Sequence, residues 1–271
     1  MRHLLSLFAA AAMTVVAAPA LACGPDRDCT IGNRTYRIAM PEGHDGKTKV
    51  GAIVFSHGYR GSAAGLMKNR NLRRTVSDMG LAFIALKSEG DDWILPNAPR
   101  HMDSDGSAEF EYVDAVIADA ANRKPIDTSR MMASGFSAGG MMTWNLACAR
   151  PNLFAGFAPI SGTFWQKPPR SCSGPAASII HIHGNNDPTV PLDGRPILNT
   201  RQGKVSDALD MYRAFGGFKK AAPTKTSRLT CDNSVNREGD LLNLCIFEGG
   251  HSFRSEYLRY AWRVFETAGR L

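Results

Sequence analysis

Beyond residue 22 the sequence lacks any apolar stretch long enough to cross a lipid bilayer as a helix. It also lacks a run of basic residues longer than a pair such as Arg73-Arg74 or Lys219-Lys220, and its formal net charge of +7 is spread along the chain. A nucleic-acid-binding protein concentrates its basic residues on one face or stripe, so this distribution argues against nucleic acid as a partner. Repeats, low-complexity tracts and charge-rich linkers are missing as well, which predicts a single domain after the N-terminal segment.

The sequence has no pair of cysteines with the CxxC spacing of a zinc or redox site. All 6 cysteines follow residue 22, and an even number of cysteines in an exported protein indicates disulfides. Proximity along the chain favours Cys23–Cys29, Cys148–Cys172 and Cys231–Cys245 among the possible pairings. A cysteine nucleophile is not expected in an oxidising compartment.

The first 22 residues are typical of a secretory signal peptide. A short basic start is followed by the apolar run 4–16 and by Ala18-Pro-Ala-Leu-Ala22, whose small residues suit signal peptidase. We therefore expect a secreted or periplasmic protein in which residues 23–271 form the catalytic domain, without a membrane anchor. An apolar first helix of the fold is the alternative. Cys23 leaves lipid attachment open, although Ala20 stands where such signals usually have leucine.

Short apolar runs alternate with segments of helical spacing along the rest of the chain. Strands are expected at 35–40, 50–55, 81–86, 130–135, 157–160, 178–183, 224–230 and 242–247, and helices at 64–79, 109–122, 138–150, 205–215 and 255–268. This alternation predicts an α/β fold with a mostly parallel central sheet and helices on both faces. In such folds the active site lies at the carboxyl ends of the strands.

A catalytic serine is predicted at Ser137, in the G-x-S-x-G motif Gly135-Phe-Ser-Ala-Gly139. The motif alone is modest evidence, but it lies between an expected strand and an expected helix, and a nucleophile elbow needs that strand–turn–helix context. The flanking glycines suit a tight, strained turn that presents the serine hydroxyl at the top of the sheet. A glycine-rich turn without chemistry is the competing interpretation.

The order of residues along the chain selects the partners of Ser137, because a serine hydroxyl needs a base and folds with this elbow present Ser, then an acid, then His. Of the 7 histidines, only His251 follows Asp187, which stands just beyond an expected strand end. We expect Asp187 to hold and stabilise the imidazole of His251, with Asp193 as the second choice of acid. His181 and His183 together with Asp187 could also form a metal site, but the predicted triad already uses Asp187, and no metal or other cofactor is expected.

The oxyanion hole requires two backbone N–H groups near the serine. The N–H of Ala138, at the start of a helix, is one, and the N–H of Tyr59 in the loop Ser56-His-Gly-Tyr-Arg-Gly61 is the other. We expect His57 to shape this loop by packing and hydrogen bonding, the alternative being a catalytic role.

Four segments together resemble the secreted polyhydroxybutyrate depolymerase and feruloyl esterase group of the α/β-hydrolase superfamily: Ser56-His-Gly-Tyr-Arg-Gly61, Gly135-Phe-Ser-Ala-Gly-Gly140, His183-Gly-Asn-Asn-Asp187 and Gly250-His251. The resemblance covers essentially the whole chain after residue 22. It implies a secreted serine esterase that acts without a cofactor, with Ser137 as nucleophile, Asp187 as acid and His251 as base. Members act on hydroxyalkanoate polyesters, on hydroxycinnamoyl esters of plant cell-wall sugars or on acetylated xylan, so an acetylxylan esterase or a general short-chain esterase is also possible.

The insertion after residue 162 is short, which predicts an open cleft without a large lid domain. Trp93, Phe164 and Trp165 follow expected strand ends and are candidates for lining this cleft, with core packing as the alternative. We expect a monomer that takes a bulky or polymer-linked ester. A serine peptidase and a non-catalytic binding protein on the same scaffold are the rival hypotheses.

Overall fold

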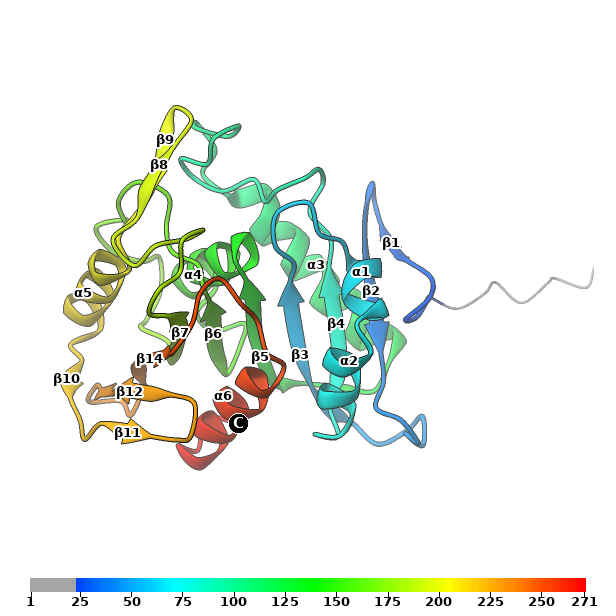
Figure 1. Ribbon diagram of the computed structural model, residues 1–271. Coiled ribbons are helices and arrows are strands. Elements are labelled where there is room, and N and C mark those ends of the chain that lie inside the picture. Colours follow the sequence, from blue (N-terminus) through cyan, green and yellow to red (C-terminus); the bar gives the residue numbers. More distant parts are fainter. Residues whose placement is uncertain (1–22) are drawn as a thin grey trace, which may run out of the picture.

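The computed structural model describes residues 23–271, and the expected signal peptide lies outside the described residues (Figure 1). The largest sheet has the strand order β1-β2-β4-β3-β5-β6-β7-β14-β12-β11. From β4 to β14 in this order, neighbouring strands run parallel, whereas the pairs at both edges are antiparallel. The parallel strands are β4 (Ala82–Leu86), β3 (Val50–Ser56), β5 (Ile126–Phe136), β6 (Gly156–Ile160), β7 (Ile179–Gly184) and β14 (Leu242–Phe247).

Helices cover both faces of the sheet, as the alternating pattern predicted (Figure 1). Helices α1 (Ala63–Lys68), α2 (Arg70–Ser77) and α6 (Glu256–Thr267) contribute to one apolar cluster, and α3 (Ser107–Arg123), α4 (Ala138–Ala149) and α5 (Val205–Gly216) contribute to the other. Each parallel strand is therefore buried on both sides, which explains why the strands are continuous apolar runs. This is the predicted α/β architecture, and residues 23–271 contain no large lid domain.

Two elements that were predicted to be continuous, one helix and one strand, are each divided in the structure. The expected helix 64–79 is broken at Asn69, whose side-chain oxygen accepts the Leu72 N–H at 3.1 Å and so starts a new helix. The expected strand 224–230 is instead the hairpin of β11 (Thr224–Lys225) and β12 (Thr230–Asp232). The Thr226 N–H donates to the Leu229 carbonyl at 2.8 Å and closes the turn between them.

Several short strands were not predicted. The hairpin of β8 (Arg195–Ile197) and β9 (Thr200–Gln202) is outside the large sheet, stands above the carboxyl ends of the parallel strands (Figure 1), and is bridged to Trp165 through Gln202. The others are the edge strand β1 (Cys29–Ile31) and the pair β10 (Lys219–Lys220) and β13 (Ser234–Val235), whereas β2 (Arg34–Ala39) was predicted with bounds one residue later. Their brevity explains why sequence periodicity did not reveal most of them.

All three disulfides join the pairs that proximity favoured. Cys23–Cys29 ties the first described residue to β1, Cys148–Cys172 ties α4 to the segment before β7, and Cys231–Cys245 joins β12 to β14. None of the helices within 23–271 combines the length and the apolar character that a membrane crossing requires.

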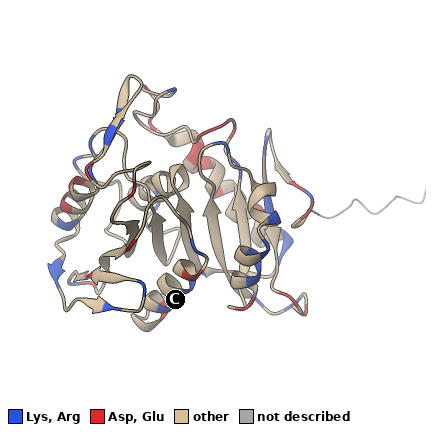
Figure 2. Ribbon diagram, viewed as in Figure 1, with Lys and Arg blue, Asp and Glu red and all other residues tan. Residues whose placement is uncertain are grey.

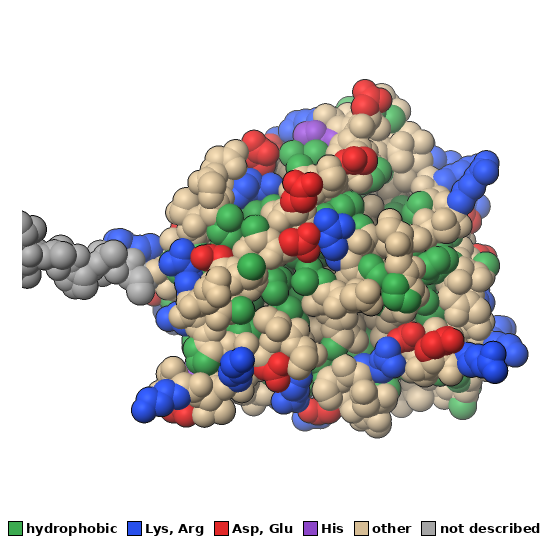
Figure 3. Space-filling model, turned by 180° about the vertical axis from the view of Figure 1, so that it is seen from behind, with side chains coloured by type: hydrophobic (Ala, Val, Ile, Leu, Met, Phe, Trp, Pro, Cys, Tyr) green, Lys and Arg blue, Asp and Glu red, His purple; other side chains and the backbone are tan. Residues whose placement is uncertain are grey.

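Charged side chains of both signs are interspersed over the surface. Figure 2 shows Lys and Arg along the same loops and helices as Asp and Glu, and Figure 3 shows the same mixture on the opposite face, with apolar side chains between the charges. Neither view shows the continuous basic stripe that a nucleic-acid-binding surface requires.

Candidate active site

Ser137 lies in a strained turn between β5 and α4. Its φ of 59° and ψ of −121° are rare for a residue with a side chain. The flanking glycines allow this turn to sit close to β3, because a Cβ on Gly139 would overlap the Ser56 carbonyl and one on Gly135 would overlap the Gly139 carbonyl. The Ser137 N–H donates to the Ile160 carbonyl of β6 at 2.9 Å. The predicted elbow is therefore present and is held by strands on both sides.

The structure brings Asp187 and His251 together. The loop after β7 carries Asp187 and the loop after β14 carries His251, and these strands are parallel neighbours. The Nδ1–H of His251 donates to Asp187 Oδ2 at 2.7 Å, while Oδ1 accepts the N–H groups of Thr189 and Val190, both at 2.9 Å. The remaining nitrogen of His251, Nε2, is thus left as the basic atom. No such bond links His251 to Asp193, the second choice of acid, within residues 23–271.

A chain of buried hydrogen bonds lies behind the Asp187 carboxylate. The indole N–H of Trp144 can only donate, so His181 Nδ1 accepts it at 3.1 Å and His181 Nε2–H donates to His183 Nδ1 at 2.9 Å. His183 Nε2–H then donates to the Val190 carbonyl at 2.8 Å and lies 3.5 Å from Asp187 Oδ2. Both rings are fully buried. All four of their ring nitrogens are engaged, which leaves no free lone pair for the metal site considered from the sequence.

This environment keeps the buried His181 neutral and the Asp187 carboxyl ionised. Burial, with the neighbouring His183, holds the pKa of His181 well below its usual value, so the ring is neutral. Burial alone would raise the pKa of the Asp187 carboxyl, but the hydrogen bonds from His183, His251 and the Val190 N–H outweigh it and keep that pKa well below its usual range. Asp187 therefore stays ionised opposite His251.

The loops of the acid and the histidine are joined to each other through Asn185. Its side-chain NH2 donates to Glu248 at 2.7 Å, and its side-chain oxygen accepts the Gly249 N–H at 3.0 Å. The Asn186 N–H donates back to the Gly249 carbonyl at 3.0 Å. Sequence reasoning missed this contact, because nothing in the sequence indicates which side chains of two distant loops pair.

His251 also packs beside the elbow. Its ring centroid lies 4.5 Å from that of Phe136, the residue before Ser137. The described structure has no hydrogen bond between the Ser137 hydroxyl and His251. Catalytic hydrogen bonds are often long or misaligned in ligand-free structures and tighten when substrate binds.

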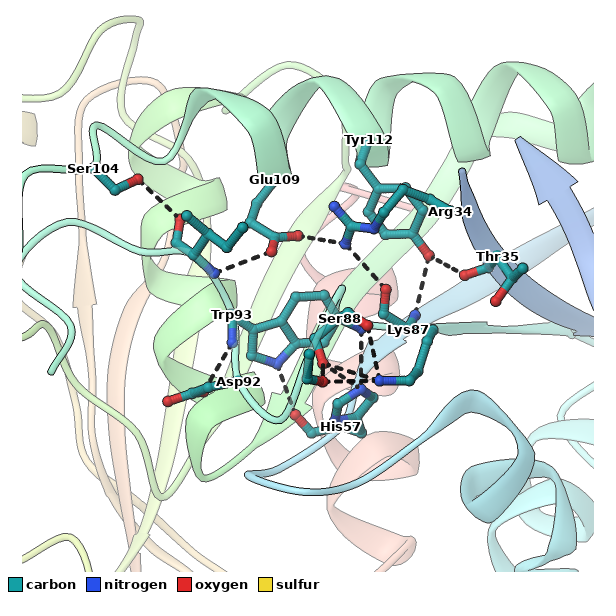
Figure 4. A network of polar contacts seen from close by, with 12 residues as sticks. Arg34, Thr35, His57, Lys87, Ser88, Asp92, Trp93, Ser104, Glu109 and Tyr112 are labelled. Atoms are coloured by element: carbon teal, nitrogen blue, oxygen red, sulfur yellow. Dashed lines mark hydrogen bonds and ion pairs between the residues drawn. The ribbon is translucent and has the colours of Figure 1, made fainter. Parts of the chain in front are cut away.

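The loop after β3 carries His57 (Figure 4) and leads to Tyr59, the predicted oxyanion donor. His57 is buried; its Nδ1–H donates to the Gly58 carbonyl at 2.7 Å and its Nε2 accepts the Ser88 N–H at 3.1 Å. Burial lowers the pKa of His57 to about 4, so the ring is neutral and cannot supply a positive charge. This is the loop-shaping role that was expected. Within the described residues the Tyr59 N–H has no hydrogen-bond partner, as an oxyanion donor requires.

A deeper polar network fixes the next loop against the His57 loop (Figure 4). Arg34 forms an ion pair with the fully buried Glu109 at 2.8 Å, and Glu109 also accepts the Ile94 N–H at 3.0 Å. The ammonium group of Lys87 donates to the Ser88 and Gly90 carbonyls, at 2.8 and 2.9 Å. The segment after β4 is thereby held at both ends.

A cleft of about 310 Å³ opens beside Ser137. Besides Ser137 and the two predicted oxyanion residues, Tyr59 and Ala138, its lining includes Trp165, which was predicted to lie there. The hairpin β8–β9 forms part of the wall, and its tip residue Leu198 is 85% exposed. The other lining residues are Asp92, Pro99, Arg100, His101, Met141, Thr189, Arg195, Ile197 and Gln202.

Two of the predicted cleft residues are instead part of the core. Trp93 is 0% exposed, and its indole N–H donates to the His57 carbonyl at 2.8 Å, so its polar atom is satisfied inside the protein. Phe164 is buried with its ring centroid 5.6 Å from that of Trp144. Neither lines the cleft, and the prediction for these two side chains was wrong.

Comparisons with known proteins agree with this architecture. A family model described as Phospholipase/Carboxylesterase matches residues 91–205. A protein of Aspergillus terreus named "Probable feruloyl esterase C" is 28% identical over 252 residues, which cover 88% of this chain and 86% of that protein. Among solved structures, the fold is similar to an acetyl xylan esterase from Aspergillus awamori, with a TM-score of 0.60, 15% identity and coverage of 92% of this chain and 97% of that one.

The feruloyl esterase module from Clostridium thermocellum is similar too, with a TM-score of 0.58, 13% identity and coverage of 98% of this chain and 96% of that module. Together the fold, the family match and the relatives make this chain similar to one class of protein, the esterases of the α/β-hydrolase fold. Within that class it is a carboxylic ester hydrolase.

Proposed function

We propose that this protein is an exported serine esterase that cleaves bulky or polymer-linked carboxylic esters through an acyl-enzyme on Ser137. The observation that carries the proposal is the 2.7 Å hydrogen bond between His251 Nδ1 and the ionised Asp187, which leaves the other imidazole nitrogen as a base beside the Ser137 turn. The three disulfides support export, because disulfides persist in oxidising compartments.

In the first half of the reaction, Ser137 Oγ attacks the ester carbonyl carbon while its proton passes to His251 Nε2. The carbonyl oxygen becomes an oxyanion, which the N–H groups of Ala138 and Tyr59 stabilise. The tetrahedral intermediate then collapses, the C–O bond to the alcohol breaks, and the alcohol leaves with the proton from His251.

In the second half, a water molecule gives a proton to His251 and attacks the acyl carbon. The bond to Ser137 breaks, the serine recovers its proton from His251, and the carboxylic acid is released. Asp187 stays ionised throughout and stabilises the imidazolium that forms in each half.

The cleft favours esters with a bulky acyl or alcohol group. Trp165 and the exposed Leu198 provide apolar surface, and the site has no large lid that would have to open. Hydroxycinnamoyl esters of plant polysaccharide and hydroxyalkanoate oligomers fit this description, and the similarity to proteins named feruloyl esterase supports the first of these.

The substitution Ser137→Ala tests the proposal. It is expected to abolish hydrolysis of p-nitrophenyl butyrate and of methyl ferulate, because no other nucleophile takes part. Circular dichroism and thermal unfolding serve as the control that the variant is folded. A folded variant that hydrolyses either ester at the wild-type rate contradicts the proposal.

A further inference from the structure

One carboxylate in the wall of the cleft has no part in the proposed reaction. Asp92 lines the cleft together with Ser137 and Trp165 and belongs to the loop after β4. Its Oδ1 accepts the Trp93 N–H at 2.9 Å, whereas its Oδ2 has no hydrogen-bond partner among the described residues. Figure 4 shows the side chain pointing away from the polar network behind it. One charged oxygen therefore faces the cleft with an open position.

The surroundings of this free oxygen favour a partner from the cleft. Asp92 is half-buried, and burial raises the pKa of its carboxyl above the usual value, although the hydrogen bond from the Trp93 N–H and the nearby His101 and Arg100 lower it. Neither group forms a hydrogen bond or an ion pair with Asp92 within residues 23–271. A half-buried carboxylate oxygen with an open position favours a ligand that brings its own donor.

The side chain cannot easily turn away from the cleft. The indole of Trp93 is anchored to the His57 carbonyl at 2.8 Å, and the Ile94 N–H is anchored to the buried Glu109 at 3.0 Å. On the other side, the Asp91 carbonyl accepts the Arg60 N–H at 2.7 Å. The same contacts hold the loop that carries Tyr59. The free oxygen of Asp92 and the Tyr59 N–H, the proposed oxyanion donor, are therefore held in fixed positions relative to each other.

We propose that Asp92 is a specificity-determining residue, whose free carboxylate oxygen accepts a hydrogen bond from a hydroxyl group of the substrate while the ester carbonyl lies at Ser137. The inference rests on the proposed esterase function and deepens it, because it selects esters that carry a hydroxyl group away from the ester bond. That hydroxyl belongs either to the acyl part, as in a phenol, or to the alcohol part, as in a sugar. The chemistry that Asp92 recognises is the same in both.

Two pairs of esters that differ by hydroxyl groups alone test this. The first pair, methyl 4-hydroxycinnamate and methyl cinnamate, places the hydroxyl in the acyl part. The second pair, 2,3-dihydroxypropyl cinnamate and propyl cinnamate, places it in the alcohol part. We expect the wild-type protein to prefer the hydroxylated member of at least one pair by about tenfold to a hundredfold in kcat/KM, since a hydrogen bond to a charged group is lost with the other member.

Asp92→Ala is expected to bring that ratio close to one, and Asp92→Asn, which keeps an acceptor oxygen, is expected to keep an intermediate ratio. Asp91→Ala is the matched control, because its side chain pairs with the exposed Arg60 and Arg100 and does not itself line the cleft, and its ratio is expected to equal that of the wild type. The pair in which the effect occurs tells which part of the substrate carries the hydroxyl.

A wild-type protein that hydrolyses both members of each pair equally well overturns this inference and leaves the esterase function intact, even if the Asp92 variants fail to fold. Asp92→Ala that loses activity on both members by the same factor also overturns it, because the role is then structural. A wild-type protein that hydrolyses none of the four esters contradicts the proposed function and this inference together.

Discussion

The two loops that flank Ser137 are both held by buried histidines, but these histidines hold different kinds of atom. On the acid side, His183 receives a hydrogen bond from His181 and donates to the Val190 carbonyl, with the Asp187 carboxylate 3.5 Å away. The imidazole there supports a charged side chain. The chain of donors runs in one direction, so each ring has a single possible tautomer.

On the opposite side, His57 binds mainly backbone groups, and the Ser88 hydroxyl lies 3.3 Å from its Nε2. It accepts the Ser88 N–H and donates to the Gly58 carbonyl, and its own carbonyl accepts the Trp93 indole N–H. These bonds set the path of the main chain up to the Tyr59 N–H. The histidines near Asp187 therefore position a charged carboxylate through side-chain contacts. His57, in contrast, positions the backbone N–H of Tyr59 through contacts with the main chain. The comparison teaches that substitutions on the acid side act mainly on the rate, and those on the other side act first on stability.

The largest effect on the rate is expected when the negative charge of Asp187 is removed. Asp187→Asn should lower kcat by about 10⁴-fold, because the amide offers its NH2 to His251 and stabilises the wrong tautomer. The measurement is steady-state hydrolysis of p-nitrophenyl butyrate. Asp193→Asn, six residues further along the same segment and without a bond to His251, is the control and is expected to stay close to the wild-type rate. Equal losses in the two variants would refute the assignment of the acid.

On the side of His57, the free energy of unfolding is expected to depend on pH. His57 has a pKa of about 4 in the folded protein and about 6.5 when unfolded, so between these values the unfolded chain binds more protons. The stabilisation is present above pH 6.5 and is lost as the pH falls to 4, by roughly 3 kcal/mol for this group. Urea unfolding of the wild type and of His57→Gln at several pH values measures it. Parallel curves for the two proteins would show that His57 does not titrate in this way.

A smaller effect is expected for the side chain behind the acid. His183→Phe removes both hydrogen bonds of the ring and should lower kcat by about tenfold to a hundredfold through a displaced Asp187, with little change in KM. His183→Gln keeps a donor near the Val190 carbonyl and should recover part of the rate. If the glutamine variant is folded and no better than the phenylalanine variant, or if the loss lies in KM, His183 does not position the acid.

Much of the fold and of the candidate site could be predicted from the sequence, because strong local signals carry them. The strand 242–247 has the predicted bounds, since a continuous apolar run between polar turns admits few alternatives. Ser137 was predicted because its glycines are needed for close approach of the backbone. The meeting of Asp187 with His251 follows from chain order and from the parallel pairing of β7 with β14.

The rest depends on contacts between distant segments, which local patterns do not encode. Trp93 looked like a cleft residue, and only the His57 carbonyl, far away in the sequence, explains why it is buried. The hairpin β8–β9 has polar residues and Pro196, and nothing in the sequence marks it as a wall of the cleft. The unpaired oxygen of Asp92 becomes apparent only when the neighbours of this residue are in place.

The central claim is that Ser137, activated by His251 and Asp187, is the one nucleophile of the protein. Treatment with a fluorophosphonate followed by mass spectrometry of the intact protein and of its peptides tests this claim most directly. The account predicts one adduct per chain, located on Ser137, together with complete loss of esterase activity. Loss of activity with the adduct on another residue, or full activity in a protein labelled at Ser137, would contradict it.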